Sequence, residues 1–171
     1  MFATTALGAG VIVTFLPLAV PASMSGLVAG VLFLQPAAAT AARWCAGRIG
    51  DRRGAAGLVL PGLLLSAAGL LVTAATGSAV AVLAGVTLFG IGFGIAQNAT
   101  LAVMYARVPA SGYGTVSALW NVAYDAGMGA GAVGYGAIAA RTGYPAAFAL
   151  TAAVMLLALW PAFRDRRSPA A

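Results

Sequence analysis

Asp125 is the side chain best placed to do chemistry, because it is the one charged group in residues 113–140. A helix beginning near residue 113 would carry it about 18 Å along the axis, close to the middle of a membrane. An ionisable group at that depth is by default a functional hypothesis. Its carboxylate could bind and release a proton or hold a cation. Alternatively, it could be a structural group that is hydrogen-bonded to Asn121.

Other polar side chains recur beside Asp125 at helical spacing. Ser117, Asn121 and Asp125 follow one another at intervals of four residues, so they share one helix face, with Tyr124 at its edge. We expect this face to line a pathway for a substrate or a proton.

Three amides interrupt the other apolar segments: Gln35, Gln97 and Asn98. Each could hydrogen-bond a substrate, or instead bond a neighbouring helix, which contributes about 0.6 kcal/mol in a membrane. Gln97 and Asn98 are adjacent and would point about 100° apart on a helix, so we expect at most one of them to face a pathway squarely.

Two glycine-rich runs superficially suggest a dinucleotide site: Gly90-x-Gly92-x-Gly94 and residues 127–136. That motif needs a strand before it and a helix after it, whereas both runs lie inside apolar segments. Gly127 and Gly131 instead form a small-xxx-small face, which predicts a close contact between helices.

The composition is that of an integral membrane protein. Hydrophobic residues make up 62% of the 171 residues and charged residues only 7%, against about 25% charged in soluble domains. His, Lys and Glu are all absent, which excludes most metal sites and His-based nucleophilic catalysis. We therefore expect no metal, no cofactor and no enzymatic activity.

Six apolar segments are each long enough to cross a membrane, since about twenty helical residues span its core. A signal peptide at the start would need a positive region, and Met1–Thr5 carries no charge. The sequence thus predicts an all-α protein of six transmembrane helices and a tail, 164–171. The expected spans are about 1–20, 23–46, 55–76, 79–106, 113–140 and 144–163.

The arginines fall almost entirely on one side of these spans. Eight lie at one set of ends and only Arg141 at the other, which predicts that the eight are cytoplasmic and that both termini are too. Their confinement to loops favours a membrane topology signal in the plasma membrane over nucleic-acid binding. The eight are Arg43, Arg48, Arg52, Arg53, Arg107, Arg164, Arg166 and Arg167.

Residues 43–54 hold five of the twelve charged residues. They cannot lie inside hydrocarbon, where a central Arg or Asp costs about 2.5–3.5 kcal/mol, so we expect a polar joint between two helices. Its pattern, Gly47-x-Ile49-x-Asp51-Arg52-x-Gly54, resembles the G-x-L-x-D-R-x-G loop of the major facilitator superfamily. The last two family positions, usually basic, are Ala55 and Ala56 here.

The order of the spans resembles helices 7 to 12 of that family, the C-terminal half of its twelve-helix unit. Phe15-Leu16-Pro17-Leu18 looks like the outer end of helix 7, the run at Gly90 looks like helix 10, and residues 117–136 look like helix 11. The resemblance implies that the third and sixth spans are outer supports, and these are also the least polar spans.

The resemblance also implies a role for the motif. In the family, the loop Asp contacts helix ends of the opposite half and helps to set the balance between inward and outward states. The resemblance therefore implies a conformational switch that consists of Gly47, Asp51, Arg52, Gly54 and Arg43. We expect Asp51 at the start of the third span, facing the positive end of its helix dipole. Arg43 would pair with Asp51 or lie at the lipid headgroups.

The resemblance favours a secondary transporter of a small solute, or the C-terminal half of one, working by alternating access with a proton on Asp125 as the candidate coupling ion. The bilayer, the solute and either an N-terminal half or a second copy would be its partners. The alternative is a non-transporting membrane fragment or assembly partner; a membrane enzyme is the weakest interpretation.

Overall fold

Every long apolar segment of residues 2–157, the part of the chain that the computed structural model describes, is helical. The all-α, six-helix class predicted from the sequence is confirmed. Residues 158–163 of the expected sixth span and the tail lie outside the described residues. The helices are α1 (Phe2–Ala19), α2 (Ser25–Arg53), α3 (Ala56–Thr73), α4 (Ala79–Tyr105), α5 (Tyr113–Thr142) and α6 (Tyr144–Leu157), with short 3₁₀ turns η1 (Ala22–Met24) and η2 (Ala110–Gly112).

Within residues 2–157, four helical segments are long and apolar enough to cross a membrane: α1, α2 with its preceding turn, α3 and α4. Helix α5 is longer than most of these, but its glycines and polar residues, Asn121 and Asp125 among them, lower its mean hydropathy. The described part of α6 is a shorter apolar helix. The lengths agree with about 20 residues for a hydrocarbon core of about 30 Å.

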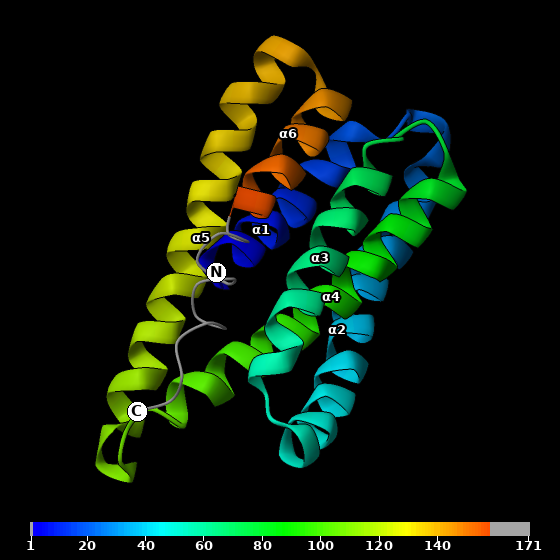
Figure 1. The fold of residues 1–171 in the computed structure, drawn as a ribbon. Helices are drawn as coiled ribbons and strands as arrows, with labels where there is room; N and C mark the ends of the chain where they lie inside the picture. The colour runs from blue at the N-terminus through cyan, green and yellow to red at the C-terminus, as the bar shows by residue number, and fades with distance from the viewer. Residues whose placement is uncertain (1, 158–171) are drawn as a thin grey trace.

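Helix α4 is the central element of one group of helices, since α3 and α2 pack most closely against it. Helix α1 packs mainly on α5, so the first helix of the chain finds its main neighbour late in the sequence. Helices α4 and α5 follow each other in sequence but make little contact. In Figure 1, α5 lies along one edge of the bundle and α2, α3 and α4 lie at the other.

Glycines allow α4 to approach α2 closely. A Cβ atom on Gly90 would collide with the backbone carbonyl of Gln35, and one on Gly94 with that of Ala39. These two glycines are four residues apart, so both face α2 at the same crossing. The run that superficially suggested a nucleotide-binding loop is therefore a packing surface within a helix.

The same arrangement joins α5 to α1. A Cβ atom on Gly127 would collide with the carbonyl of Ala3, and one on Gly131 with the carbonyl of Leu7. The predicted small-xxx-small contact at Gly127 and Gly131 is confirmed. Its partner helix, which the sequence did not identify, is α1.

The charged joint after the second span differs from the expectation. Helix α2 does not end at residue 46 but continues to Arg53, and Gly54 ends it with a positive φ of 85° and an N–H bond of 2.8 Å to Gly50 O. Residues 43–54 were expected to be a joint between two helices because they cannot lie in hydrocarbon, but charge excludes a segment from hydrocarbon without preventing it from being helical. Most of the motif is therefore the final turns of α2.

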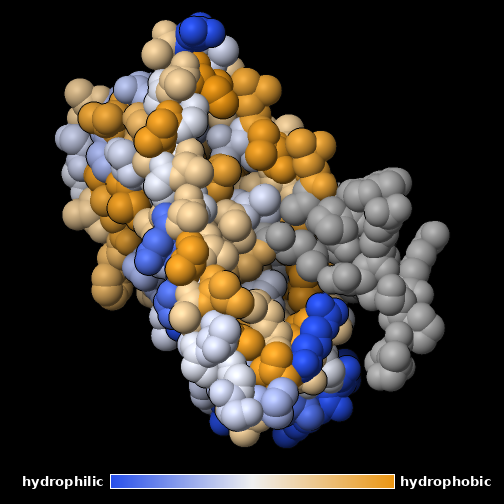
Figure 2. Space-filling model, turned by 90° about the vertical axis from the view of Figure 1, so that its left-hand side faces the viewer, coloured by the Kyte–Doolittle hydropathy of each residue, from blue (hydrophilic) through white to orange (hydrophobic). Residues whose placement is uncertain are grey.

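The outward surface is largely apolar. Phe33 is 74% exposed and Val80 and Val133 are each 77% exposed, which fits contact with lipid rather than water. Figure 2 shows apolar residues over much of one face, with the most hydrophilic ones mainly towards its two ends. The end that carries the C-terminus of α2 and of α4 and the N-terminus of α5 is called the arginine-rich end below.

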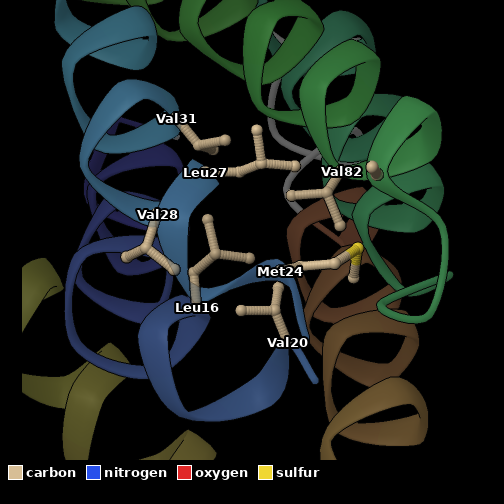
Figure 3. Close-up of a pocket in the computed structure, with 8 residues that line it drawn as sticks. Leu16, Val20, Met24, Leu27, Val28, Val31 and Val82 are labelled. Carbon is tan, nitrogen blue, oxygen red and sulfur yellow. The ribbon is translucent and has the colours of Figure 1, made fainter. Parts of the chain in front are cut away.

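An apolar gap lies at the opposite end of the bundle, beneath the turn between α1 and α2. Its volume of about 10 Å³ is barely enough for one water, and its lining offers no polar side chain. Figure 3 shows Leu16, Met24 and Val82 among the side chains that converge on it. We interpret it as a packing gap rather than a binding site.

Candidate functional site

A partly polar pocket lies at the arginine-rich end, between α2, α4 and α5. Its volume is about 200 Å³. It is the described pocket whose lining includes several of the candidate residues. The lining consists of Arg43 from α2, Gln97, Asn98, Leu101, Ala102 and Tyr105 from α4, and Trp120 from α5.

Helical periodicity explains why five residues of α4 line the pocket together. Gln97, Leu101 and Tyr105 are spaced four residues apart, and Asn98 and Ala102 form the adjacent row, so these side chains lie on neighbouring strips of one face. Both amides line this pocket, because it lies between their two directions. The expectation that at most one of them faces a pathway squarely stays a prediction.

Arg43 is the charged residue of the pocket. Its Nη2 donates a hydrogen bond to Oε1 of Gln97, which is buried and 6% exposed. This bond joins α2 to α4. Among the described residues, no ion pair joins Arg43 to Asp51, which lies eight residues further along the same helix, about 12 Å at about 1.5 Å per residue. The pairing, one of two alternatives expected for Arg43, is therefore not seen in this structure.

The depth of the pocket can be estimated from two helices independently. Arg43 lies about 27 Å along α2 from Ser25, and Gln97 lies about 27 Å along α4 from Ala79, at about 1.5 Å per residue. A hydrocarbon core is about 30 Å thick. The Arg43–Gln97 pair therefore lies near the edge of the core at the arginine-rich end.

Two hydrogen bonds hold α5 against α4 beside the pocket. Trp120 Nε1 donates to Thr100 Oγ1 at 3.3 Å, and Thr100 in turn donates to the Ala96 carbonyl at 2.6 Å. The hydroxyls of Tyr105 and Ser117 share a bond of 2.6 Å. Both interactions fix the orientation of an aromatic side chain that lines the pocket.

An aromatic stack supports Trp120 from the side of α1. The ring of Phe2 lies 4.2 Å from that of Trp120 with an interplanar angle of 13°, and the ring of Tyr124 lies 6.0 Å from Trp120 at 1°. Phe93 of α4 continues the cluster, 6.3 Å from Phe2. Tyr124 is therefore a packing residue in this structure, and its ring helps to orient Trp120.

Asp125 and Asn121 do not line the pocket. Both are exposed on α5, and the side-chain nitrogen of Asn121 donates 2.8 Å to the Ser117 carbonyl rather than to Asp125. Within residues 2–157, Asp125 has no hydrogen-bond or ion-pair partner. Gln35 is buried at the crossing of α2 with α4, about 12 Å along the helix from Arg43.

The motif residues are placed differently from the expectation. Asp51 and Arg52 are exposed in the last turn of α2, and not at the start of the third span as predicted. Gly54 forms the break before α3. Gly47 lies beside the pocket, where a Cβ atom would be 3.5 Å from Asn98 Nδ2, an ordinary contact distance.

Trp120, Tyr105 and Thr100 were not among the predicted site residues. A tryptophan beside Ser117 and Asn121 in a weakly apolar helix is a signal that could have identified Trp120, since its N–H needs a partner when buried. No group of three or more potential metal ligands of the His, Cys, Asp or Glu type occurs among the described residues.

Comparison with known families gives one match. The model of a family described as the Major Facilitator Superfamily matches residues 1–171. A search of curated proteins found no match.

Proposed function

Because the chain belongs to the Major Facilitator Superfamily, we propose that it is a secondary active transporter of a small solute, or the C-terminal half of one. Members of this family are membrane transporters rather than enzymes. We propose that transport proceeds by alternating access, with the solute bound between two six-helix units that rock about it. These six helices would be the equivalents of helices 7 to 12.

The observation that carries this proposal is the placement of polar groups on the outside of the bundle. Asp125 and Asn121 are exposed on α5, in the middle of a long membrane helix. A carboxylate facing lipid at that depth would be expensive, so it needs water or protein opposite to it. A second six-helix unit, an N-terminal half or a second copy, would enclose this face and leave a hydrated pathway.

We propose that Asp125 carries the coupling proton. Its carboxylate has no partner among the residues that the structure describes, so it is available to take up and release a proton. Gln35, Gln97, Asn98, Asn121 and Tyr124 would contribute further polar contacts along the pathway or hold its helices in place.

We further propose a plasma membrane protein with its arginine-rich end in the cytoplasm, because five of the six arginines in residues 2–157 lie at that end. Asp51, Arg52, Gly47 and Gly54 would then form the cytoplasmic switch that contacts the opposite unit in one state and releases it in the other. Support comes from the exposure of Asp51 and Arg52 at the end of α2.

Cysteine accessibility tests the pathway without knowledge of the solute. The background is Cys45→Ala, which removes the one native thiol of the sequence. In this background, the thiol introduced by Asp125→Cys should react with a membrane-impermeant maleimide added outside right-side-out vesicles and outside inverted vesicles, which expose opposite faces of the membrane. Leu64→Cys is the control, because Leu64 is exposed on the apolar outer face of α3. Thiolates do not form in hydrocarbon, so that position should stay unreactive.

If the thiol introduced by Asp125→Cys is as unreactive as the one introduced by Leu64→Cys from both sides, position 125 does not line a hydrated pathway. The proposal then fails, and the alternative of a non-transporting membrane fragment or assembly partner is favoured.

A further inference from the structure

The positive charge of Arg43 is not matched by a negative charge in its surroundings. The sequence holds three acids, Asp51, Asp125 and Asp165. Asp51 lies about two turns further along α2, and Asp125 is exposed on α5 and does not line the pocket. Asp165 lies outside the described residues. Arg43 is thus a cation beside a cavity with no carboxylate in contact among the residues described.

The guanidinium group retains hydrogen-bonding capacity. It has five N–H donors, and the bond to Gln97 Oε1 uses one; no second partner occurs within residues 2–157. Arg43 is exposed and lies near the edge of the hydrocarbon, so its remaining donors are accessible to a ligand that enters the pocket. A planar guanidinium held in this way is well suited to bind a carboxylate through two parallel hydrogen bonds.

The rest of the lining divides into a polar and an apolar part. The polar part consists of the amides of Gln97 and Asn98 and the hydroxyl of Tyr105, and every fully buried side-chain nitrogen or oxygen among the described residues has a partner. An amide nitrogen of Gln97 or Asn98 that has no hydrogen-bond partner therefore cannot be fully buried, and it is accessible from the pocket or from solvent. Such nitrogens are additional donors for an anion.

The apolar part consists of Leu101, Ala102 and Trp120. The Trp120 indole is held in place by its bond to Thr100 and by stacking on Phe2, so little conformational entropy remains to be lost when a ligand packs against it. An aromatic ring stacks favourably on such a surface.

We propose that this pocket binds a small organic anion, with its carboxylate on Arg43 and its apolar or aromatic body against Trp120. The identification of that anion as the transported solute rests on the proposed function. The binding itself does not, because it can be measured without transport. An anionic lipid headgroup would also satisfy the guanidinium. The pocket favours a carboxylate with an apolar body, because its walls around Trp120 are largely apolar.

The test is equilibrium binding of radiolabelled benzoate to the purified full chain in a neutral detergent. Arg43→Gln should weaken binding by about tenfold to hundredfold, the effect of a lost charged hydrogen-bond pair, and Arg43→Lys by less. Arg48→Gln is the matched control. It removes one positive charge from the same helix, but the guanidinium of Arg48 lies over the Trp44 ring at 3.5 Å and does not line the pocket. The affinity of the Arg48→Gln protein for benzoate should stay within about twofold of that of the wild type.

A second measurement keeps the test decisive if Arg43→Gln does not fold. Benzamide has the size of benzoate without its charge, so the wild-type protein should bind it at least about tenfold more weakly. Equal binding of the two would overturn the proposal. So would equal losses in Arg43→Gln and Arg48→Gln.

Nanodiscs with and without phosphatidylglycerol distinguish the two sources of the anion. If benzoate binds in both and depends on Arg43, the proposal is supported. If benzoate does not bind and phosphatidylglycerol is retained in an Arg43-dependent manner, the site belongs to a lipid headgroup and the proposal is overturned. Neither result changes the maleimide reactivity of the Asp125→Cys variant, so failure here is distinguishable from failure of the proposed function.

Discussion

Arg43 of α2 donates its guanidinium hydrogen bond to the side-chain oxygen of Gln97 on α4, and so links the two helices at the edge of the membrane core. The α2–α4 crossing has two parts: a glycine contact around Gly90 and Gly94, and this polar contact nearer the arginine-rich end. The first brings the backbones together, and the second sets the side chains of the pocket.

Substitution of Gln97 should separate the stability of the protein from its affinity for benzoate. In Gln97→Glu, an internal carboxylate would pair with Arg43, so the protein should be at least as stable as the wild type while benzoate binding falls by about tenfold or more. In Gln97→Leu, Arg43 loses its one described partner, and unfolding should become easier by about 1–3 kcal/mol. Thermal melting in detergent and benzoate binding measure the two quantities. A Gln97→Glu protein that binds benzoate as well as the wild type would contradict the role of Arg43.

The α1–α5 contact should be sensitive to a single methyl group. Gly131→Ala places a Cβ atom against the Leu7 carbonyl and should destabilise the protein by about 1–3 kcal/mol, the usual effect of overpacking. Gly129→Ala lies two residues away on the same helix with nothing within 4 Å of the new atom, and it should be neutral or stabilising by up to about 1 kcal/mol. Thermal melting compares the two, and equal effects would show that the contact does not form.

Asp125→Asn should leave stability almost unchanged. The carboxylate is exposed and has no partner in the described part of the chain, so the thermal stability should change by no more than about 0.5 kcal/mol. Thr100→Val is the comparison, because it removes the acceptor of the Trp120 N–H bond and should cost about 1 kcal/mol or more. A larger loss in Asp125→Asn than in Thr100→Val would favour the structural interpretation of Asp125 over proton coupling.

The last glycine of the motif should be required by the backbone. Gly54 has a φ of 85°, which an L-residue adopts at a cost of about 1–2 kcal/mol, so Gly54→Ala should destabilise the α2–α3 junction by that amount. Gly26→Ala, near the start of α2 and open on all sides, is the control and should be neutral or slightly stabilising. The readout is thermal melting, together with limited proteolysis at residues 53–55. No difference between the two variants would contradict the observed turn.

The size of the particle in mild detergent identifies the second six-helix unit. Light scattering on the chain expressed alone should give two chains per particle if a second copy completes the pathway. One chain per particle would assign the opposite wall to a separate N-terminal half. In that case, co-expression with such a half should raise the mass of the particle measured by light scattering. If the chain forms a dimer, co-expression should leave the mass of the particle unchanged.

The sequence predicted those features that depend on local pattern. Six apolar runs of sufficient length predicted six helices, and the spacing of Gly127 and Gly131 predicted a close helix contact, because both signals act over a few turns. The end of α2 was misplaced for a physical reason. Arg48, Asp51 and Arg52 have no place in hydrocarbon, yet they are compatible with a helix that extends beyond it.

The pocket depends on contacts between distant segments. Arg43 and Gln97 were both noted in the sequence, but their bond joins residues of different helices, and nothing in either segment indicates the other. Trp120 contributes through its bond to Thr100 and its stack on Phe2. Thr100 lies in the preceding helix and Phe2 lies in α1, so both partners follow only from the tertiary structure.

The pairing of α1 with α5 has a consequence for biosynthesis. Leu7 meets Gly131 only after about 120 more residues have been made, which at about 5–20 residues per second takes roughly 6–25 seconds. During that interval, the first helix must wait in the insertion machinery or in lipid without its main neighbour. Helices α2, α3 and α4 can already assemble around Gly90 and Gly94. Helix α1 therefore gains its main neighbour only after α2, α3 and α4 have been made.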